Sequence, residues 1–240
     1  MMSMQNKDWL SRSLIINNTS GEDGTLTIHR VGAAAISFRY CYNGDCKWTY
    51  LTISANKTIT LPANSSIYIQ GDNKSTATNS TYWKIYANVA HTLSGLASGL
   101  IGGGREMSNQ YAMMNLFNGD TALTDASELK MPTKLTNFCC SGMFNGCTAL
   151  VKAPELPATS LVKQCYYRMF YSCGSLNYIK AMFTAAPVNK GSASNQTYQW
   201  VSGVASEGTF VMSSAATWSA DDYTGVSGVP SGWAVATADS

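Results

Sequence analysis

The first half of the chain is dominated by short runs in which apolar and polar residues alternate. Leu26 and Ile28 alternate with threonines, and Trp83 and Ile85 alternate with polar or tyrosine neighbours. A period of two is typical of a half-buried β-strand. Five or six such strands, separated by turn signals, predict an antiparallel β-sandwich over residues 21–90. Residues 1–20 are expected to form an N-terminal arm, or to contribute a first strand.

A hairpin is predicted at Asn43-Gly44, because both residue types accept the positive φ that a tight turn requires. A two-residue loop would place Cys41 opposite Cys46, whereas a three-residue loop would place Phe38 opposite Tyr50. The second register gathers the apolar side chains on one face, so we predict it. A Cys41–Cys46 disulfide stays open, although this register takes the two residues out of direct opposition.

From residue 107 the alternation gives way to a longer repeat. Phe117 and Phe144 are 27 residues apart, and Phe144 and Phe170 are 26 apart. Units of this length cannot bury their apolar face alone and stack on one another. We therefore predict a short solenoid over residues 107–190, with Phe144 in its interior between the other two phenylalanines. Residues 191–240 are expected to cap it, with strands near 209–212 and 233–235.

Residues 91–106 contain Gly95, Gly99 and the run Gly102-Gly103-Gly104. They lack both the Gly-Lys-Ser/Thr ending of a phosphate-binding loop and the spacing of a dinucleotide fingerprint. We expect a joint between the sandwich and the solenoid.

The repeats resemble a known family. Leu156-Pro157, Leu161, Met169-Phe170, Cys173 and Leu176 follow an order similar to the leucine-rich repeats of BspA-type surface proteins, which occur in gut Bacteroidales bacteria and their phages. The resemblance covers roughly residues 107 to 240. It includes the closing stretches 177–183, 200–204 and 228–233, while Asp120 departs from it by replacing the first repeat cysteine. It implies a leucine-rich-repeat module for surface recognition, without naming a ligand.

Composition excludes some functions. The net charge is +2 and only 12% of the 240 residues are charged, so nucleic-acid binding is not expected. No stretch approaches the ~20 apolar residues of a membrane helix, and we expect no membrane insertion. The first residues also lack an apolar core of signal-peptide length.

No motif indicates an enzyme, a cofactor or a metal site. Both histidines, His29 and His91, are isolated in sequence, no nucleophile elbow occurs, and the few carboxylates lie in turns or repeat loops. Five of the seven cysteines fall in the repeats and are expected to be buried free thiols, since no zinc spacing is present. Catalytic, cofactor and metal residues are therefore predicted to be none. Ligand-binding residues stay unknown, although aromatic side chains gather around Arg168.

These features favour a non-enzymatic phage virion protein, such as a head fibre, capsid decoration or tail appendage. Its N-terminal region would bind other virion proteins, and its repeats would bind a bacterial surface or glycan. The chain would assemble in the host cytoplasm, be exposed on the virion, and form a homo-oligomer. The alternative is a bacterial adhesin of the same family, secreted or on the cell surface.

Overall fold

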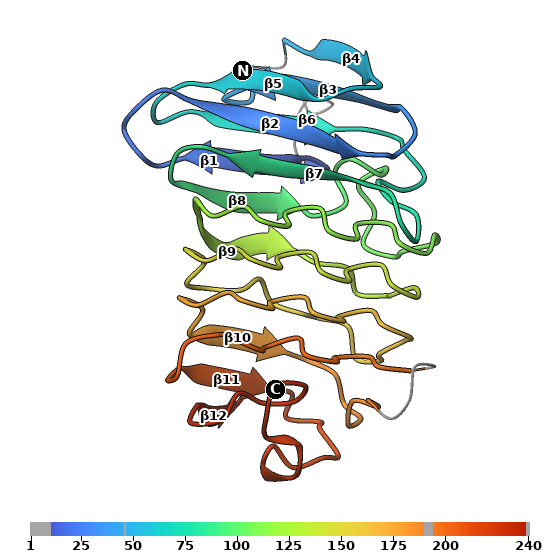
Figure 1. Ribbon diagram of the computed structural model, residues 1–240, viewed down its shortest axis with the longest axis vertical. Coiled ribbons are helices and arrows are strands. Elements are labelled where there is room, and N and C mark those ends of the chain that lie inside the picture. The colour runs from blue at the N-terminus through green and yellow to red at the C-terminus, as the bar shows by residue number, and fades with distance from the viewer. Residues whose placement is uncertain (1–10, 46, 190–193, 239–240) are drawn as a thin grey trace.

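The computed structural model describes residues 11–45, 47–189 and 194–238, and it is mainly β, with three sheets, none of which is closed (Figure 1). The elements are β1 (Leu14–Asn18), β2 (Gly24–Val31), β3 (Ile36–Tyr42), β4 (Thr49–Ile53), β5 (Lys57–Leu61), β6 (Ser66–Gln70), β7 (Tyr82–Ala87), β8 (His91–Leu96), β9 (Leu123–Lys130), β10 (Tyr178–Ala181), β11 (Thr209–Met212), the 3₁₀ turn η1 (Asp221–Tyr223) and β12 (Ala234–Thr237).

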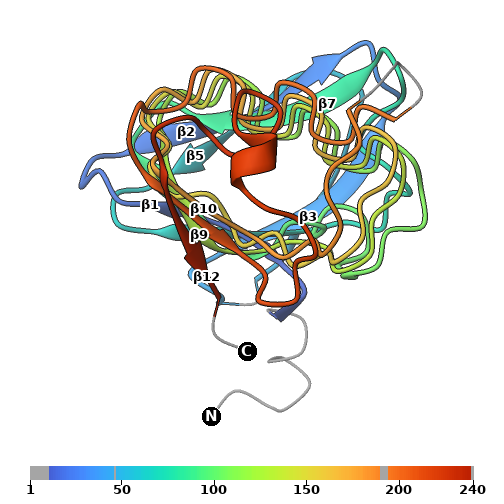
Figure 2. The same cartoon turned by 90° about the horizontal axis from the view of Figure 1, so that it is seen from below.

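Two sheets face each other in the N-terminal part, as the view along the long axis shows (Figure 2). One has the order β4-β3-β6-β1-β8-β9 and the other the order β5-β2-β7, with antiparallel pairing throughout except between β8 and β9. The alternating residues of β2 and β7 bury their apolar side chains, Leu26 and Ile28 on one and Trp83 and Ile85 on the other. The alternation predicted from the sequence is confirmed for these strands.

Of the two alternatives for the N-terminal residues, the first strand is confirmed for residues 14–18, which form β1 in the middle of the larger sheet, between β6 and β8. One expected boundary lies elsewhere. Residues 91–96, assigned to a joint, form β8, whose positive-φ Gly95 has no room for a Cβ against the carbonyl oxygen of Ser13. A glycine inside a strand marks such a close backbone approach. Residues 1–10 of the expected arm lie outside the described residues.

The predicted hairpin register is wrong. Asn43 and Gly44 do adopt positive φ, and the Asp45 amide donates to the Tyr42 carbonyl 2.9 Å away, as in a tight turn. However, β4 begins only at Thr49, so Arg39 pairs with Tyr50, and the Tyr50 side chain is 70% exposed. The extra residues between the turn and β4 shift the pairing from both registers considered. The possible partner of Cys41, Cys46, lies outside the described residues.

Beyond β8 the chain passes through four stacked segments, residues 108–119, 137–146, 163–172 and 195–203. Alternate amides of the first three segments donate to carbonyls of the segment that follows, as Phe117 does to Met143 at 2.9 Å and Phe144 does to Met169 at 2.9 Å. The intervening amides donate three residues back within their own segment. Each segment is therefore a ribbon of successive turns, bonded to its neighbour along its length.

The interior of the stacked segments contains the predicted phenylalanine ladder. The ring centroids of Phe117 and Phe144 are 5.4 Å apart, and those of Phe144 and Phe170 are 5.6 Å apart, with interplanar angles of 20° and 15°. All three side chains are fully buried. The predicted position of Phe144 is confirmed.

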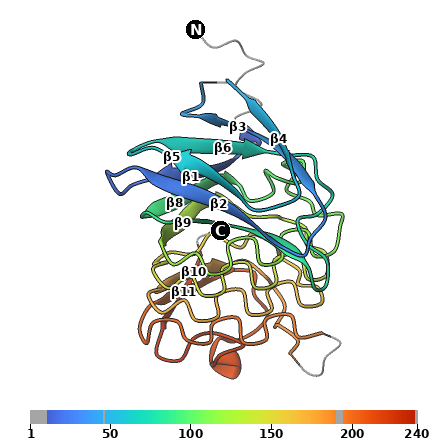
Figure 3. The ribbon, with the colours of Figure 1, turned by 45° about the horizontal axis from the view of Figure 1, so that its top comes forward.

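The C-terminal part ends in the parallel sheet β10-β11-β12, which lies at the opposite end of the molecule from β3 and β4 (Figures 1 and 3). The predicted strand at 209–212 is confirmed as β11, and the last strand runs from 234 to 237. Among the described residues, no helix has the length and apolarity needed to cross a membrane.

Candidate functional site

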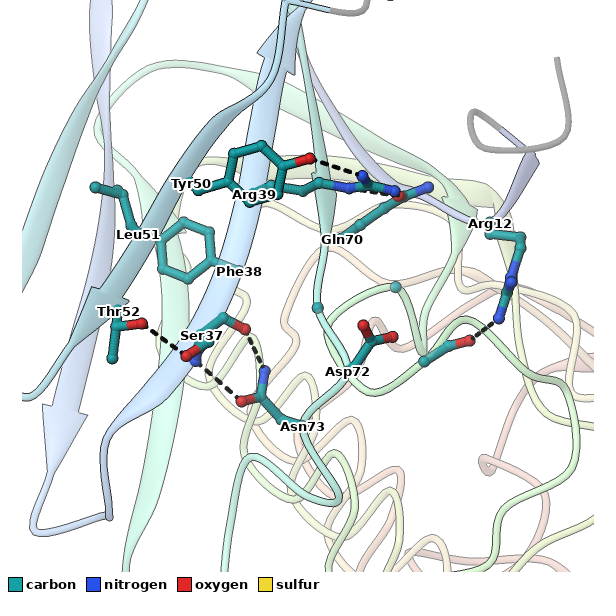
Figure 4. Close-up of a pocket in the computed structure, with 13 residues that line it drawn as sticks. Arg12, Ser37, Phe38, Arg39, Tyr50, Leu51, Thr52, Gln70, Asp72 and Asn73 are labelled. Atoms are coloured by element: carbon teal, nitrogen blue, oxygen red, sulfur yellow. Dashed lines mark hydrogen bonds between the residues drawn. The ribbon is translucent and has the colours of Figure 1, made fainter. Parts of the chain in front are cut away.

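Two surface features could bind a partner: a cleft in the N-terminal sheets and the outward face of the stacked segments. The cleft has a volume of about 550 Å³, within the range of ligand pockets. It lies beside β3 and β4, at the end of β6 and against the turn that follows β8 (Figure 4). Its lining contains no histidine or cysteine and consists of Arg12, Ser37, Phe38, Arg39, Tyr50, Leu51, Thr52, Gln70, Gly71, Asp72, Asn73, Gly99 and Gly102.

A hydrogen-bond network holds Arg39 at one side of the cleft. Its Nε and Nη2 donate to Oε1 of Gln70 at 3.1 and 2.6 Å, and its Nη1 donates to the Tyr50 hydroxyl at 3.1 Å. Gln70 in turn donates to Oγ of the buried Ser13 at 3.0 Å. The guanidinium also lies over the Trp48 ring, 4.6 Å from its centroid. These contacts fix the guanidinium in one orientation.

The floor of the cleft is closed by Asn73. Its Nδ2 donates to the carbonyls of Ser37 and Leu100, both at 2.8 Å, and its Oδ1 accepts the Ser37 amide at 3.0 Å. Gly71 packs here without space for a Cβ, which would meet the same two carbonyl oxygens at 2.7 Å. The floor thus joins β3 to the turn after β8. Because it presents polar groups beside aromatic rings and no nucleophile paired with a base, the cleft is suited to holding a polar ligand.

The outward side of the stacked segments, which we call the turn face, is ordered in columns. Every fourth residue has a positive φ, and these residues align between segments, as Asn115, Gly142, Arg168 and Gln199 do. Eight of these residues are not glycine: Tyr111, Asn115, Phe138, Gln164, Arg168, Ser172, Asn195 and Gln199. Their side chains are partly exposed, in contrast to the buried ladder within.

An aromatic cluster on the turn face surrounds Arg168. Its guanidinium carbon lies 5.3 Å from the ring centroids of both Tyr167 and Tyr171, and its Nε donates to Oε1 of Gln199 at 2.9 Å. Tyr167 stacks on the exposed Tyr198 of the next segment, with centroids 5.6 Å apart. We call these five residues the Arg168 cluster. Two tyrosines close to Arg168 in sequence lie outside the cluster: Tyr166 is fully buried against Trp200, and Tyr178 begins β10.

The chain matches no protein-family model, no curated protein and no solved structure. Its function therefore has to be argued from these surfaces and from the buried polar groups behind them.

His91 and Asp120 form a buried pair where β8 meets the first stacked segment. Each side chain is 1% exposed, and Nε2 of His91 lies 3.0 Å from Oδ2 of Asp120. Nδ1 of His91 lies 3.0 Å from the Val89 carbonyl oxygen. Both ring nitrogens therefore face acceptors, which favours the doubly protonated ring.

The pKa of His91 reflects these contacts. Burial lowers it, but the Asp120 carboxylate and the Val89 carbonyl outweigh burial and raise the pKa above its ordinary value. The pair joins the facing sheets to the stacked segments. Because both side chains are sealed from solvent, no substrate can contact them. Asp120 occupies the position at which Cys147 and Cys173 stand in the next two segments.

The repeat cysteines are confirmed as buried free thiols. The thiols of Cys147 and Cys173 donate to the carbonyls of Phe117 and Phe144, at 3.1 and 3.0 Å, so each joins its segment to the preceding one. Burial raises the pKa values of Cys165 and Cys173 to about 12. Within the described residues no three metal-ligating side chains come together.

The second histidine and the carboxylates of the turns and repeat loops have separate surroundings. His29 contacts Tyr86, Glu155 pairs with Lys180 at 2.9 Å, and the adjacent Asp221 and Asp222 lie exposed in η1. Sequence reasoning missed the cleft, whose polar groups come from four separate strands and turns. It also missed the His91–Asp120 pair, although a carboxylate at a buried repeat position was a usable signal.

Proposed function

We propose that this chain is a non-enzymatic recognition protein whose stacked segments form a short leucine-rich-repeat solenoid of the BspA-type kind. In this proposal the facing sheets are a β-sandwich that covers one end of the solenoid. The C-terminal sheet covers the other end, and the turn face contacts a host surface or glycan.

The observation that carries the proposal is the division between the two sides of the stacked segments. The inside holds a ladder of fully buried phenylalanines and thiols, while the outside holds aligned aromatic and amide side chains that remain partly exposed. Every segment is bonded to the next along its length, which makes this outer surface rigid. Rigid aromatic side chains with a polar end are the residues that recognition surfaces favour.

The N-terminal sheets are proposed to attach the chain to a larger assembly. Within the described part of the chain, no strand pairs with the outer edge of β4. An open strand edge is a template for a strand of another protein. The cleft lies beside the same strand, and the exposed Tyr50 belongs to both features. A partner strand could therefore pair with β4 while its side chains enter the cleft.

A phage virion is the favoured assembly, and a surface adhesin of a bacterium is the second candidate. The cysteines favour the virion, because all five repeat cysteines serve as buried packing residues. Unbridged thiols suit assembly in a reducing cytoplasm. A homo-oligomer on the particle would present several turn faces and strengthen a weak individual contact.

Mass spectrometry of purified phage particles and of culture supernatant tests this assignment. The proposal expects the chain in particles, whereas detection only in bacterial supernatant or on bacterial cells would favour the adhesin.

Point variants of the full chain test the division of roles. Tyr198→Ala should weaken adherence to host cells and leave incorporation into particles unchanged, while Tyr50→Ala should do the opposite. Both residues are exposed tyrosines, so each variant is the control for the other. The reverse result would assign recognition to the cleft and attachment to the stacked segments.

A further inference from the structure

The Arg168 cluster has one cation, and its guanidinium is already immobilised. Two tyrosine rings hold it at 5.3 Å from each centroid, and Gln199 accepts its Nε–H at 2.9 Å. An arginine fixed in this way loses little further freedom when it binds a ligand. The cluster is therefore organised before any partner arrives.

The amino groups of Arg168 are left for a ligand. A guanidinium has five N–H donors, and within the described residues only the Nε–H of Arg168 has a hydrogen-bond acceptor. The ion pairs of the described chain are His91–Asp120, Lys134–Glu106 and Lys180–Glu155, so no described carboxylate neutralises this cation. The fork of remaining donors matches the two oxygens of a carboxylate.

The backbone conformation of Arg168 is shared by its whole column. Arg168 has a φ of 49°, and Asn115, Gly142 and Gln199 in the same column have φ values of 57°, 60° and 52°. The column therefore accepts glycine, asparagine and longer side chains, and its backbone does not itself require an arginine.

The chemistry around the guanidinium defines the ligand class. Tyr198 is exposed and stacks on Tyr167, and Tyr171, which also contacts the guanidinium, is half-buried, so the cluster offers aromatic surface as well as the charge. Lys163, at the start of the same segment, is engaged elsewhere, because its Nζ lies over the Phe138 ring, 5.5 Å from the centroid. One available positive charge suits a singly charged carboxylate better than a doubly charged phosphate.

From these contacts we propose that the Arg168 cluster binds an acidic saccharide. The sugar carboxylate would accept hydrogen bonds from the Nη groups of Arg168, and the face of a sugar ring would lie against the exposed tyrosine. This deepens the proposed function, on which it rests, by naming the class of glycan that the turn face selects.

A glycan-binding titration of the full chain tests the inference. The probes are oligosaccharides that carry uronic or sialic acid, their neutral counterparts, and sulfated sugars of the same length. At least one carboxylate-bearing probe should bind about tenfold more tightly than its neutral counterpart, and the preference should weaken with added salt. Equal affinity for acidic and neutral probes, or a preference for sulfated ones alone, would overturn the carboxylate assignment.

Arg168→Asn is the decisive variant, because Asn115 shows that asparagine fits this column. The variant should fold normally and lose about tenfold in affinity for the acidic probe. Lys134→Gln, which removes an exposed cation elsewhere, is the control and should bind like the unaltered chain. If Arg168→Asn binds the acidic probe as well as the control does, the inference is wrong.

The two proposals can fail separately. A chain that binds the acidic probe through Arg168 but does not adhere to host cells would contradict the proposed function alone. Adherence that survives Arg168→Asn but is lost in Tyr198→Ala would contradict only the acidic-saccharide inference.

Discussion

The facing sheets and the stacked segments both bury an apolar interior but are held together in different ways. In the sheets, β1 lies between β6 and β8, which follow it by about fifty and eighty residues. In the stacked segments, each residue contacts the one that stands about one repeat later, as in the phenylalanine ladder. Contacts that recur at a regular spacing can therefore be predicted from the sequence. A contact that is made only once becomes known only from the folded structure.

The largest expected loss of stability follows from a change in the apolar interior of the stacked segments. Phe144→Ala should lower the free energy of unfolding by about 3–5 kcal/mol, because it removes a fully buried ring that contacts a phenylalanine on each side. Chemical denaturation measures the loss. Tyr198→Ala, on the surface of the same segments, is the control and should change it by less than about 1 kcal/mol. A loss below that limit for Phe144→Ala would show that the ladder is not the core.

A smaller effect is expected where the two regions meet. Asp120→Cys restores the residue type of the later segments but leaves His91 buried without its carboxylate, and should cost about 1–3 kcal/mol. The pKa of His91 is raised in the folded chain, so the contribution of the pair is fully present below the unfolded pKa of about 6.5. It is lost as the pH rises through the folded pKa.

The pH dependence separates this pair from ordinary packing. Unfolding measured at pH 6 and again at pH 9 should show a larger gap between Asp120→Cys and the unaltered chain at the lower pH. A gap of the same size at both values would mean that the cost comes from packing and not from the charge on His91.

The last comparison is between the stability costs of substituting two glycines, one in each region. A Cβ at Gly99 would collide with the backbone nitrogen of Leu14, so Gly99→Ala should cost about 1–3 kcal/mol by displacing β1. Gly146 has a φ of 76°, but a Cβ there meets only ordinary contacts with Gly119 at 3.7 Å or more. Gly146→Asn should therefore cost less than about 1 kcal/mol, since asparagine tolerates this region. Thermal unfolding of both variants checks the order, and a greater loss for Gly146→Asn would reverse it.

Much of the fold could be predicted because the apolar residues that determine it recur at regular spacings. The spacing of Phe117, Phe144 and Phe170 placed all three in one interior, and alternation placed β2 and β7. The hairpin register could not be predicted, because β4 begins only at Thr49 and pairs with β3 in neither of the two short-loop registers. The Asn43-Gly44 turn alone does not encode where the next strand begins.

The candidate sites follow the same rule. The Arg168 cluster was visible as aromatic residues around an arginine, although its Tyr198 and Gln199 partners come from the next segment. The cleft was not visible, because Gln70, Asn73 and Arg39 meet only after the strands pair. The Arg39–Gln70 and Ser37–Asn73 hydrogen bonds join positions 31 and 36 residues apart, and no sequence spacing predicts them.

The central claim is that the turn face recognises the partner and the cleft region does not. Hydroxyl-radical footprinting of the isolated full chain, free and bound to host-cell surface material, compares the two regions in one experiment. Tyr198 and Tyr50 are both exposed reporters, one on each feature. The account predicts that binding protects Tyr198 and leaves Tyr50 as reactive as in the free chain. Protection of Tyr50 with no change at Tyr198 would contradict it.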